Sequence, residues 1–208
     1  MSGVTERVFH EEELYEKVKR YAEEGGFPQS LWALNFASEM HSGQVRKGPE
    51  GVPYIIHPLY MGCQAIALGI ADDDLLTAVL LHDVCEDCGV MPEELSVSEE
   101  VREAVRFVTR IGSKDDAAAE CAYYQAISEN RLASMVKLLD RCHNTAFLAL
   151  GMKGEKLARY VRETEEHFYP LLESTAEKWP EYGPACWQLK YQIGSVLQTI
   201  KALRDCTY

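Results

Sequence analysis

The residues best suited to chemistry lie in one short stretch, His82-Asp83-Val84-Cys85-Glu86-Asp87. An apolar run, residues 75–81, precedes this stretch and predicts a buried helix, with Asp72 as its N-cap. If that helix continues, each of the two acids at its far end lies one turn after a member of the His-Asp pair, so all four polar groups share one face. Imidazole combined with carboxylates is the ligand chemistry of a divalent metal.

Three carboxylates on one helix face repel one another. Two unit charges ~4 Å apart interact with roughly 4 kcal/mol at an effective dielectric of 20, so a buried cluster of this kind needs a cation. A divalent metal would supply that charge. The alternative for this stretch alone is a solvated acidic helix end, which is common in an acidic protein.

A further candidate ligand is His57, which stands at the entry to a predicted helix. Because Pro58 follows it, its backbone should be extended, which would fix the direction of its side chain. Taken alone, a histidine in this position is more often a capping or core residue than a ligand.

The third source of ligands is the predicted helix 132–150. Asp140, His143 and Asn144 share one of its faces at spacings of three and four, among apolar residues. Polar groups on a buried face must be paired or ligated. The alternative to a metal site is a hydrogen-bonded core network that includes Arg141.

The elements that must position these residues are predicted to be helices. Most of the 208 residues show helical periodicity, with very little strand signal and no internal repeat or linker. We therefore expect one all-α domain over 1–208, with a motif core at about 30–150 and C-terminal helices over 155–205. The predicted helices are 11–24, 28–42, 58–68, 72–81, 98–110, 115–130, 132–150, 155–179 with a kink at Pro170, and 184–205.

The composition and charge of the chain bear on its binding partners, its location and the state of its cysteines. A net charge of −12 argues against nucleic acid or an anionic membrane as the main partner. The polar N-terminus has no signal region, and no run approaches the ~20 apolar residues of a membrane span, so we expect a cytoplasmic protein. The seven cysteines are odd in number and scattered, which indicates reduced thiols. The oligomeric state stays open.

Four linked motifs resemble the HD superfamily of metal-dependent phosphohydrolases. The nearer resemblance is to the hydrolase domain of the RelA/SpoT type and its small stand-alone relatives, and it covers residues 30 to 150. The motifs are HSGQVRK at 41–47, PYIIHP at 53–58, LLHDVCED at 80–87 and KLLDRCHN at 137–144.

This resemblance implies an HD-domain helical bundle that binds a divalent metal, manganese in the family. It implies removal of the 3′-pyrophosphate from (p)ppGpp to give GDP or GTP and pyrophosphate. The metal ligands that it implies are His57, His82, Asp83 and Asp140. The other implied roles are Glu86 and Asp87 for the attacking water, Arg46 and Lys47 for the nucleotide, with Arg46 against the base, and Asn144 for supporting the site or touching the substrate.

The chemistry of these side chains is consistent with that role. A shell of two histidines and two carboxylates suits manganese, iron or zinc without choosing among them. Glu86 could accept a proton from water, and a guanidinium such as that of Arg46 can stack on a purine.

Two alternatives stay open from sequence. The loop from Lys47 to Pro53 is longer than in the long bifunctional enzymes, so the substrate could be another nucleotide, such as NADPH, a nucleoside phosphate or a cyclic nucleotide. A non-catalytic, nucleotide-sensing helical module is the other alternative. Separately, Cys85 and Cys88 form a Cys-x-x-Cys that is either a redox switch, a second metal site or a pair of packed thiols.

Overall fold

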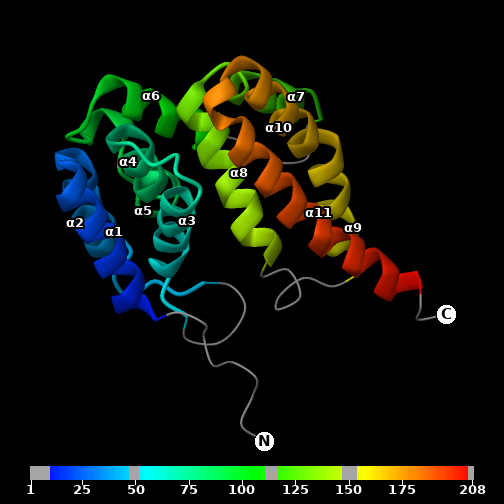
Figure 1. The fold of residues 1–208 in the computed structure, drawn as a ribbon, viewed down its shortest axis with the longest axis horizontal. Helices are drawn as coiled ribbons and strands as arrows, with labels where there is room; N and C mark the ends of the chain where they lie inside the picture. The colour runs from blue at the N-terminus through cyan, green and yellow to red at the C-terminus, as the bar shows by residue number, and fades with distance from the viewer. Residues whose placement is uncertain (1–9, 47–51, 111–116, 147–153, 206–208) are drawn as a thin grey trace, which may run out of the picture.

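The structure, a computed structural model, describes residues 10–46, 52–110, 117–146 and 154–205 (Figure 1). Within these ranges the regular elements are helices, apart from one isolated antiparallel bridge between Val45 and Pro53. The prediction of an all-α fold is confirmed. The α-helices are α1 (Glu11–Gly25), α2 (Pro28–Met40), α3 (Ile56–Ala67), α4 (Asp73–Leu81), α5 (Val84–Cys88), α6 (Glu99–Val108), α7 (Ala117–Ile127), α8 (Arg131–Ala146), α9 (Gly154–Glu163), α10 (Tyr169–Lys178) and α11 (Gly183–Asp205).

Helix α8 is the shared wall of the bundle. Figure 1 shows it between the N-terminal helices on one side and α9 to α11 on the other. It packs against α3, α4, α6, α10 and α11, and most of its residues are buried. One buried apolar cluster runs from Leu14 in α1 to Leu197 in α11, which supports the single domain that we propose.

Helix α4 precedes the chemistry-bearing stretch, which begins at its C-cap residue, His82. The side chain of Asp72 accepts a hydrogen bond of 2.7 Å from the backbone nitrogen of Leu75, so it caps the helix as predicted. Every residue from Leu75 to Leu81 is buried. A helix that is apolar on all sides belongs in the interior of the bundle, which places the residues that follow Leu81 at the edge of the core.

The helix does not continue smoothly through the acidic stretch, as the simplest prediction assumed. It ends at Leu81, and α5 begins only at Val84. Asp83 lies between them with φ −100° and ψ −8°, a sparsely populated backbone region in which active-site residues are common. The backbone bond from Asp87 nitrogen to Asp83 oxygen, 2.9 Å, still closes one helical turn.

The predicted helix over 155–179 is also divided. Helices α9 and α10 are joined by a π-helical turn, Thr164–Phe168, and Pro170 occupies the first turn of α10. A proline in the first helical turn loses no intrahelical bond, so Pro170 is compatible with the helix that follows the π turn. Within the described ranges, no helix combines the length and apolarity that crossing a bilayer requires.

Candidate metal centre

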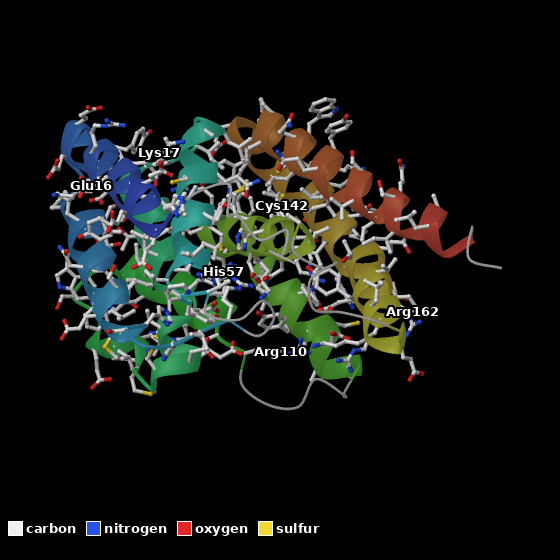
Figure 2. All side chains as sticks on the ribbon, turned by 90° about the horizontal axis from the view of Figure 1, so that it is seen from below. Glu16, Lys17, His57, Arg110, Cys142 and Arg162 are labelled. Carbon is white, nitrogen blue, oxygen red and sulfur yellow. The ribbon has the colours of Figure 1, made fainter. Side chains whose placement is uncertain are left out.

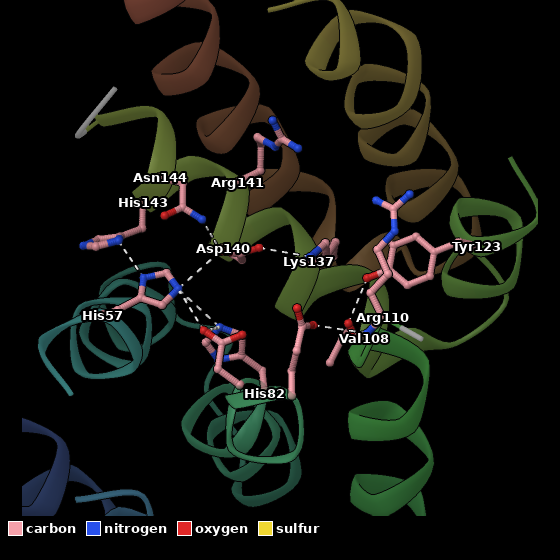
Figure 3. Close-up of polar contacts among 12 residues, drawn as sticks. His57, His82, Val108, Arg110, Tyr123, Lys137, Asp140, Arg141, His143 and Asn144 are labelled. Atoms are coloured by element: carbon pink, nitrogen blue, oxygen red, sulfur yellow. Dashed lines mark hydrogen bonds and ion pairs between the residues drawn. The ribbon is translucent and has the colours of Figure 1, made fainter. Parts of the chain in front are cut away.

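Two histidines and one aspartate meet at the junction of α3, α4 and α5 (Figure 3). The Nε2 atom of His57 lies 3.2 Å from Nε2 of His82. The Oδ2 atom of Asp83 lies 3.0 Å from the His82 nitrogen and 3.7 Å from the His57 nitrogen. Both histidines are buried. His57, labelled in Figure 2, lies in the first turn of α3, so its backbone is helical and the extended backbone expected before Pro58 was wrong.

Helix α8 adds a second carboxylate to the group. The Oδ1 atom of Asp140 lies 3.3 Å from the Nε2 atom of His57, and its Oδ2 atom lies 3.2 Å from the ammonium of Lys137. The side-chain amide of Asn144 donates to the same Oδ1 atom. The structure therefore brings His57, His82 and Asp83 together, with their ligand atoms within 4.8 Å of one another. The fourth sequence-predicted ligand, Asp140, contacts His57 but lies outside this three-residue group and is engaged with Lys137.

The hydrogen bonds fix how the imidazoles face the centre. His82 Nδ1 lies 2.8 Å from the carbonyl oxygen of Val79, which can only accept, so Nδ1 carries a proton and Nε2 is the nitrogen that faces the centre. His57 Nδ1 lies 2.7 Å from His143 Nδ1, so one of these two nitrogens carries the proton. A lone pair 3.0 Å from a carboxylate oxygen needs a proton or a cation between them. Two oriented imidazoles with carboxylate oxygens are a donor set that fits a divalent metal.

Neighbouring groups keep the carboxyl groups of Asp83 and Asp140 ionised. Burial raises the pKa of Asp83, but the charge and hydrogen bond of His82 outweigh it and hold that pKa below its usual range. For Asp140 burial is likewise outweighed, chiefly by Lys137, and its pKa is held well below normal. Burial lowers the pKa of His57. Burial also acts to lower the pKa of His82, but the charges of Asp83 and Asp140 and the hydrogen bond to Asp83 outweigh it and raise that pKa. Both aspartates are therefore ionised at neutral pH, as metal binding requires.

Tyr54 is a site residue to which the sequence analysis assigned no role, although it stands in the 53–58 motif. Its hydroxyl donates to Asp83 Oδ2 at 2.5 Å, and its ring stacks on His41 with 4.7 Å between ring centres. Burial raises the pKa of Tyr54, and the charges of Asp83 and Asp87 raise it further. The phenol therefore keeps its proton and remains a hydrogen-bond donor.

The two acids expected to act on water lie on the exposed side of α5. The Oε2 atom of Glu86 accepts a hydrogen bond of 3.2 Å from the backbone nitrogen of Arg110, at the end of α6. Asp87 lies near the hydroxyl of Tyr54, since its charge contributes to the raised pKa of that phenol. Both acids thus lie on the solvent side of α5, which begins directly after Asp83.

Of the residues expected to hold the nucleotide, Arg46 and Asn144 lie beside the centre, since Asn144 contacts both Arg46 and Asp140. Arg46 Nη2 donates to Asn144 Oδ1 at 2.6 Å, and the guanidinium carbon lies 5.8 Å from the centre of the Tyr54 ring. The other terminal nitrogen of Arg46, Nη1, is buried and has no hydrogen-bond partner among the described residues. Lys47 lies outside the described residues.

A charged cavity of about 240 Å³ opens at α7, α9 and the π turn. Arg110 joins the wall of this cavity to α5, because its backbone nitrogen is the donor to Glu86. Arg110 and Arg162, two residues of its wall, are labelled in Figure 2. The lining residues are Arg110, Glu120, Arg159, Arg162, Glu163, Glu166 and His167.

The Cys-x-x-Cys pair is packed beside the centre as free thiols. Cys88 Sγ lies 3.5 Å from the carbonyl oxygen of Met40 and 3.6 Å from His41 Nδ1. Burial raises the pKa of Cys85 to about 11 and also raises that of Cys88. Because the thiolate is the reactive form, these shifts favour packed thiols over a redox switch.

A helical bundle with a histidine, a His-Asp pair and a later aspartate converging from three places in the chain defines an HD-type domain. No protein-family model matches the chain. A solved metazoan ortholog of SpoT aligns with a TM-score of 0.65 over 83% of this chain and 95% of its own, at 22% identity, which establishes the fold.

Curated relatives share more of the sequence. A guanosine-3′,5′-bis(diphosphate) 3′-pyrophosphohydrolase of Aquifex aeolicus is 35% identical over 145 residues, 67% of this chain and 20% of the relative. The bifunctional (p)ppGpp synthase/hydrolase SpoT of Escherichia coli K12 is 30% identical over 170 residues, 77% of this chain and 24% of the relative. The pyrophosphohydrolase MESH1 of Xenopus tropicalis is 37% identical over 122 residues, 55% of this chain and 66% of the relative.

This chain belongs to the RelA/SpoT-type hydrolase-domain family of the HD superfamily. It spans only about a fifth to a quarter of the length of the long bacterial relatives.

Proposed function

We propose that this chain is a metal-dependent phosphohydrolase that removes the 3′-pyrophosphate of (p)ppGpp, giving GDP or GTP and pyrophosphate. The observation that carries the proposal is the convergence of His82, Asp83 and Asp140 on His57. The names of the Aquifex and Xenopus relatives, both guanosine-3′,5′-bis(diphosphate) 3′-pyrophosphohydrolases, support the choice of substrate. The free cysteines of the described residues support a cytoplasmic location.

The metal that we propose is Mn²⁺, held by His57, His82, Asp83 and Asp140. When bound, the cation supplies Lewis-acid chemistry toward a phosphoryl oxygen or a water molecule. The chain supplies the orientation of the ligands. Val79 fixes the His82 ring through Nδ1, which leaves Nε2 free to ligate.

In our proposal the two acids of α5, Glu86 and Asp87, act on the attacking water. Glu86 is exposed to solvent and held by the backbone of Arg110, so its carboxylate can accept a proton from an attacking water. Such general-base assistance typically contributes about 10²–10⁴-fold to the rate. Asp87, beside the Tyr54 hydroxyl, positions that water in our proposal.

Nucleotide binding falls to Arg46, Asn144 and Lys47. Asn144 holds Arg46 through one terminal nitrogen, and in our proposal the guanidinium plane stacks on the base. The arginines of the charged cavity would offset the charge of the polyphosphate in our proposal.

The test is a substrate panel with purified, metal-stripped protein to which Mn²⁺ is returned. We expect release of pyrophosphate and GDP from ppGpp in equal amounts, and loss of that release in His82→Ala. Faster release of phosphate from NADPH or a nucleoside phosphate, or faster ring opening of a cyclic nucleotide to the monophosphate, would overturn the choice of substrate. Nucleotide binding without any product would overturn the hydrolase.

A further inference from the structure

The carboxylate of Asp83 is oriented from outside its own helix. Asp83 occupies the N-cap position of α5, yet its side chain makes no capping hydrogen bond to that helix. The local backbone therefore does not fix the carboxylate, which could rotate about its side-chain torsions. Its Oδ2 atom instead receives the Tyr54 hydroxyl at 2.5 Å.

The oxygen that Tyr54 contacts is also the one that faces the candidate metal centre. Oδ2 of Asp83 lies 3.0 Å from His82 Nε2 and 3.7 Å from His57 Nε2. A hydroxyl that donates to this atom selects which carboxylate oxygen points toward the two imidazoles. Hydrogen bonds of this kind, made to a ligand rather than to the metal, are known to set ligand orientation.

Tyr54 is itself held firmly enough to do this. Its backbone nitrogen donates to the carbonyl oxygen of Gln44 at 2.9 Å. Its ring stacks on His41 at 4.7 Å and 28°, and meets the edge of His57 at 6.1 Å and 81°. Contacts on both the backbone and the ring leave the hydroxyl little freedom to point elsewhere.

We infer that Tyr54 is a positioning residue for Asp83, and that its hydroxyl preorganises the centre for a divalent cation. The inference rests on the proposed function only in taking Asp83 as a metal ligand. It concerns the affinity for the cation, which can be measured without any nucleotide.

The test compares Tyr54→Phe with Tyr21→Phe. Both substitutions remove one hydroxyl and keep the ring, but the Tyr21 hydroxyl donates to the backbone oxygen of Ala71, at 3.0 Å, and not to a residue of the centre. Mn²⁺ dissociation constants are measured by calorimetry without nucleotide, well below the melting temperature of each variant. We expect Tyr54→Phe to bind Mn²⁺ about 10–100-fold more weakly than wild type, and Tyr21→Phe to bind it as wild type does.

Melting of the metal-free proteins separates positioning from a structural role. We expect the two variants to melt at similar temperatures without metal, and only Tyr54→Phe to lose most of the rise that Mn²⁺ produces. Wild-type Mn²⁺ affinity in Tyr54→Phe would overturn the inference, as would an equal loss in both variants. If wild type binds Mn²⁺ tightly yet releases no pyrophosphate from ppGpp, the proposed function fails and this inference is still tested.

Discussion

The Nε2 atom of His57 and the Oδ1 atom of Asp140 lie 3.3 Å apart, joining α3 to α8 (Figure 3). Because Asp140 lies on α8, this distance depends on how α8 packs against the rest of the bundle. The same helix carries Lys137 and Asn144, which both contact Asp140. The candidate metal centre is thus a product of helix packing. Its properties should respond both to changes of its ligands and to changes that loosen α8.

Removing one imidazole should abolish tight metal binding. In His82→Ala, we expect the Mn²⁺ dissociation constant to rise by at least about 100-fold, since even residues that only orient ligands cost about 10–100-fold. His10→Ala is the matched control, because His10 is exposed at the start of α1. Calorimetric titration of both variants, with circular dichroism to establish folding, checks this. Unchanged affinity in folded His82→Ala would remove His82 from the ligand set.

Removing the guanidinium of Arg46, which contacts Asn144, should weaken nucleotide binding and leave the affinity for the metal unchanged. Because a hydrogen bond to a charged group contributes about 1.5–3 kcal/mol, Arg46→Ala should raise KM for ppGpp about 10–100-fold. The Mn²⁺ affinity should stay within error of wild type. Arg20→Ala, at an exposed position of α1, is the control. A fall in kcat at constant KM would argue instead for a role in the chemical step.

Arg141 should be the main anchor of α8 against the C-terminal helices. It is 6% exposed, lies between the rings of Tyr160 and Phe168 at 4.0 and 3.9 Å, and pairs with Glu163 at 2.9 Å. Removing one partner of a buried pair costs about 3–5 kcal/mol, and the partial exposure of Glu163 favours the lower end. Arg141→Met should therefore lose about 3 kcal/mol in urea unfolding.

The control for Arg141 is a solvent-exposed pair. Arg106 lies 2.9 Å from Glu93, and both side chains are largely exposed. Exposed pairs contribute little, so the unfolding midpoint of Arg106→Met should match that of wild type. Equal losses in the two variants would mean that burial of Arg141 is not what stabilises α8.

The same pair predicts an acid dependence of stability. Burial raises the pKa of Glu163, but the charge of Arg141 together with the hydrogen bonds from Tyr124 and Arg141 outweighs burial, so the pKa lies below the ordinary value of 4.5. A carboxyl with a depressed folded-state pKa stabilises the protein fully above its ordinary pKa, and the contribution is lost as pH falls through the folded-state value. Wild type should therefore lose stability more steeply than Glu163→Gln below pH 4.5, as urea unfolding across that range measures. Parallel curves would contradict the assignment.

Much of the fold was accessible from sequence because most helices bury a periodic apolar face. The run from Leu75 to Leu81 and the caps at Asp72 and Ser98 mark helix positions that the structure has. The break at His82-Asp83 was not accessible, since helical periodicity runs straight through it. The π turn before Pro170 was missed for a similar reason. A single π turn leaves the amphipathic pattern of 155–179 looking like that of one continuous α-helix.

The candidate site was predictable in its residue types and less so in its connections. His57, His82, Asp83 and Asp140 stand in motifs whose order suggested one centre. Tyr54 was missed because the partner of its hydroxyl, Asp83, lies on another helix junction, and local patterns carry no such information. The arginines of the charged cavity lie on exposed helix faces, where they resemble ordinary solvated residues until tertiary packing brings them beside Arg110.

The central claim is tested most directly by the position of the metal itself. Crystals soaked in Mn²⁺ and measured for anomalous scattering should show one peak, about 2.0–2.3 Å from the Nε2 atoms of His57 and His82 and from oxygens of Asp83 and Asp140. A peak at another place, or no peak between these four side chains at saturating Mn²⁺, would contradict the account.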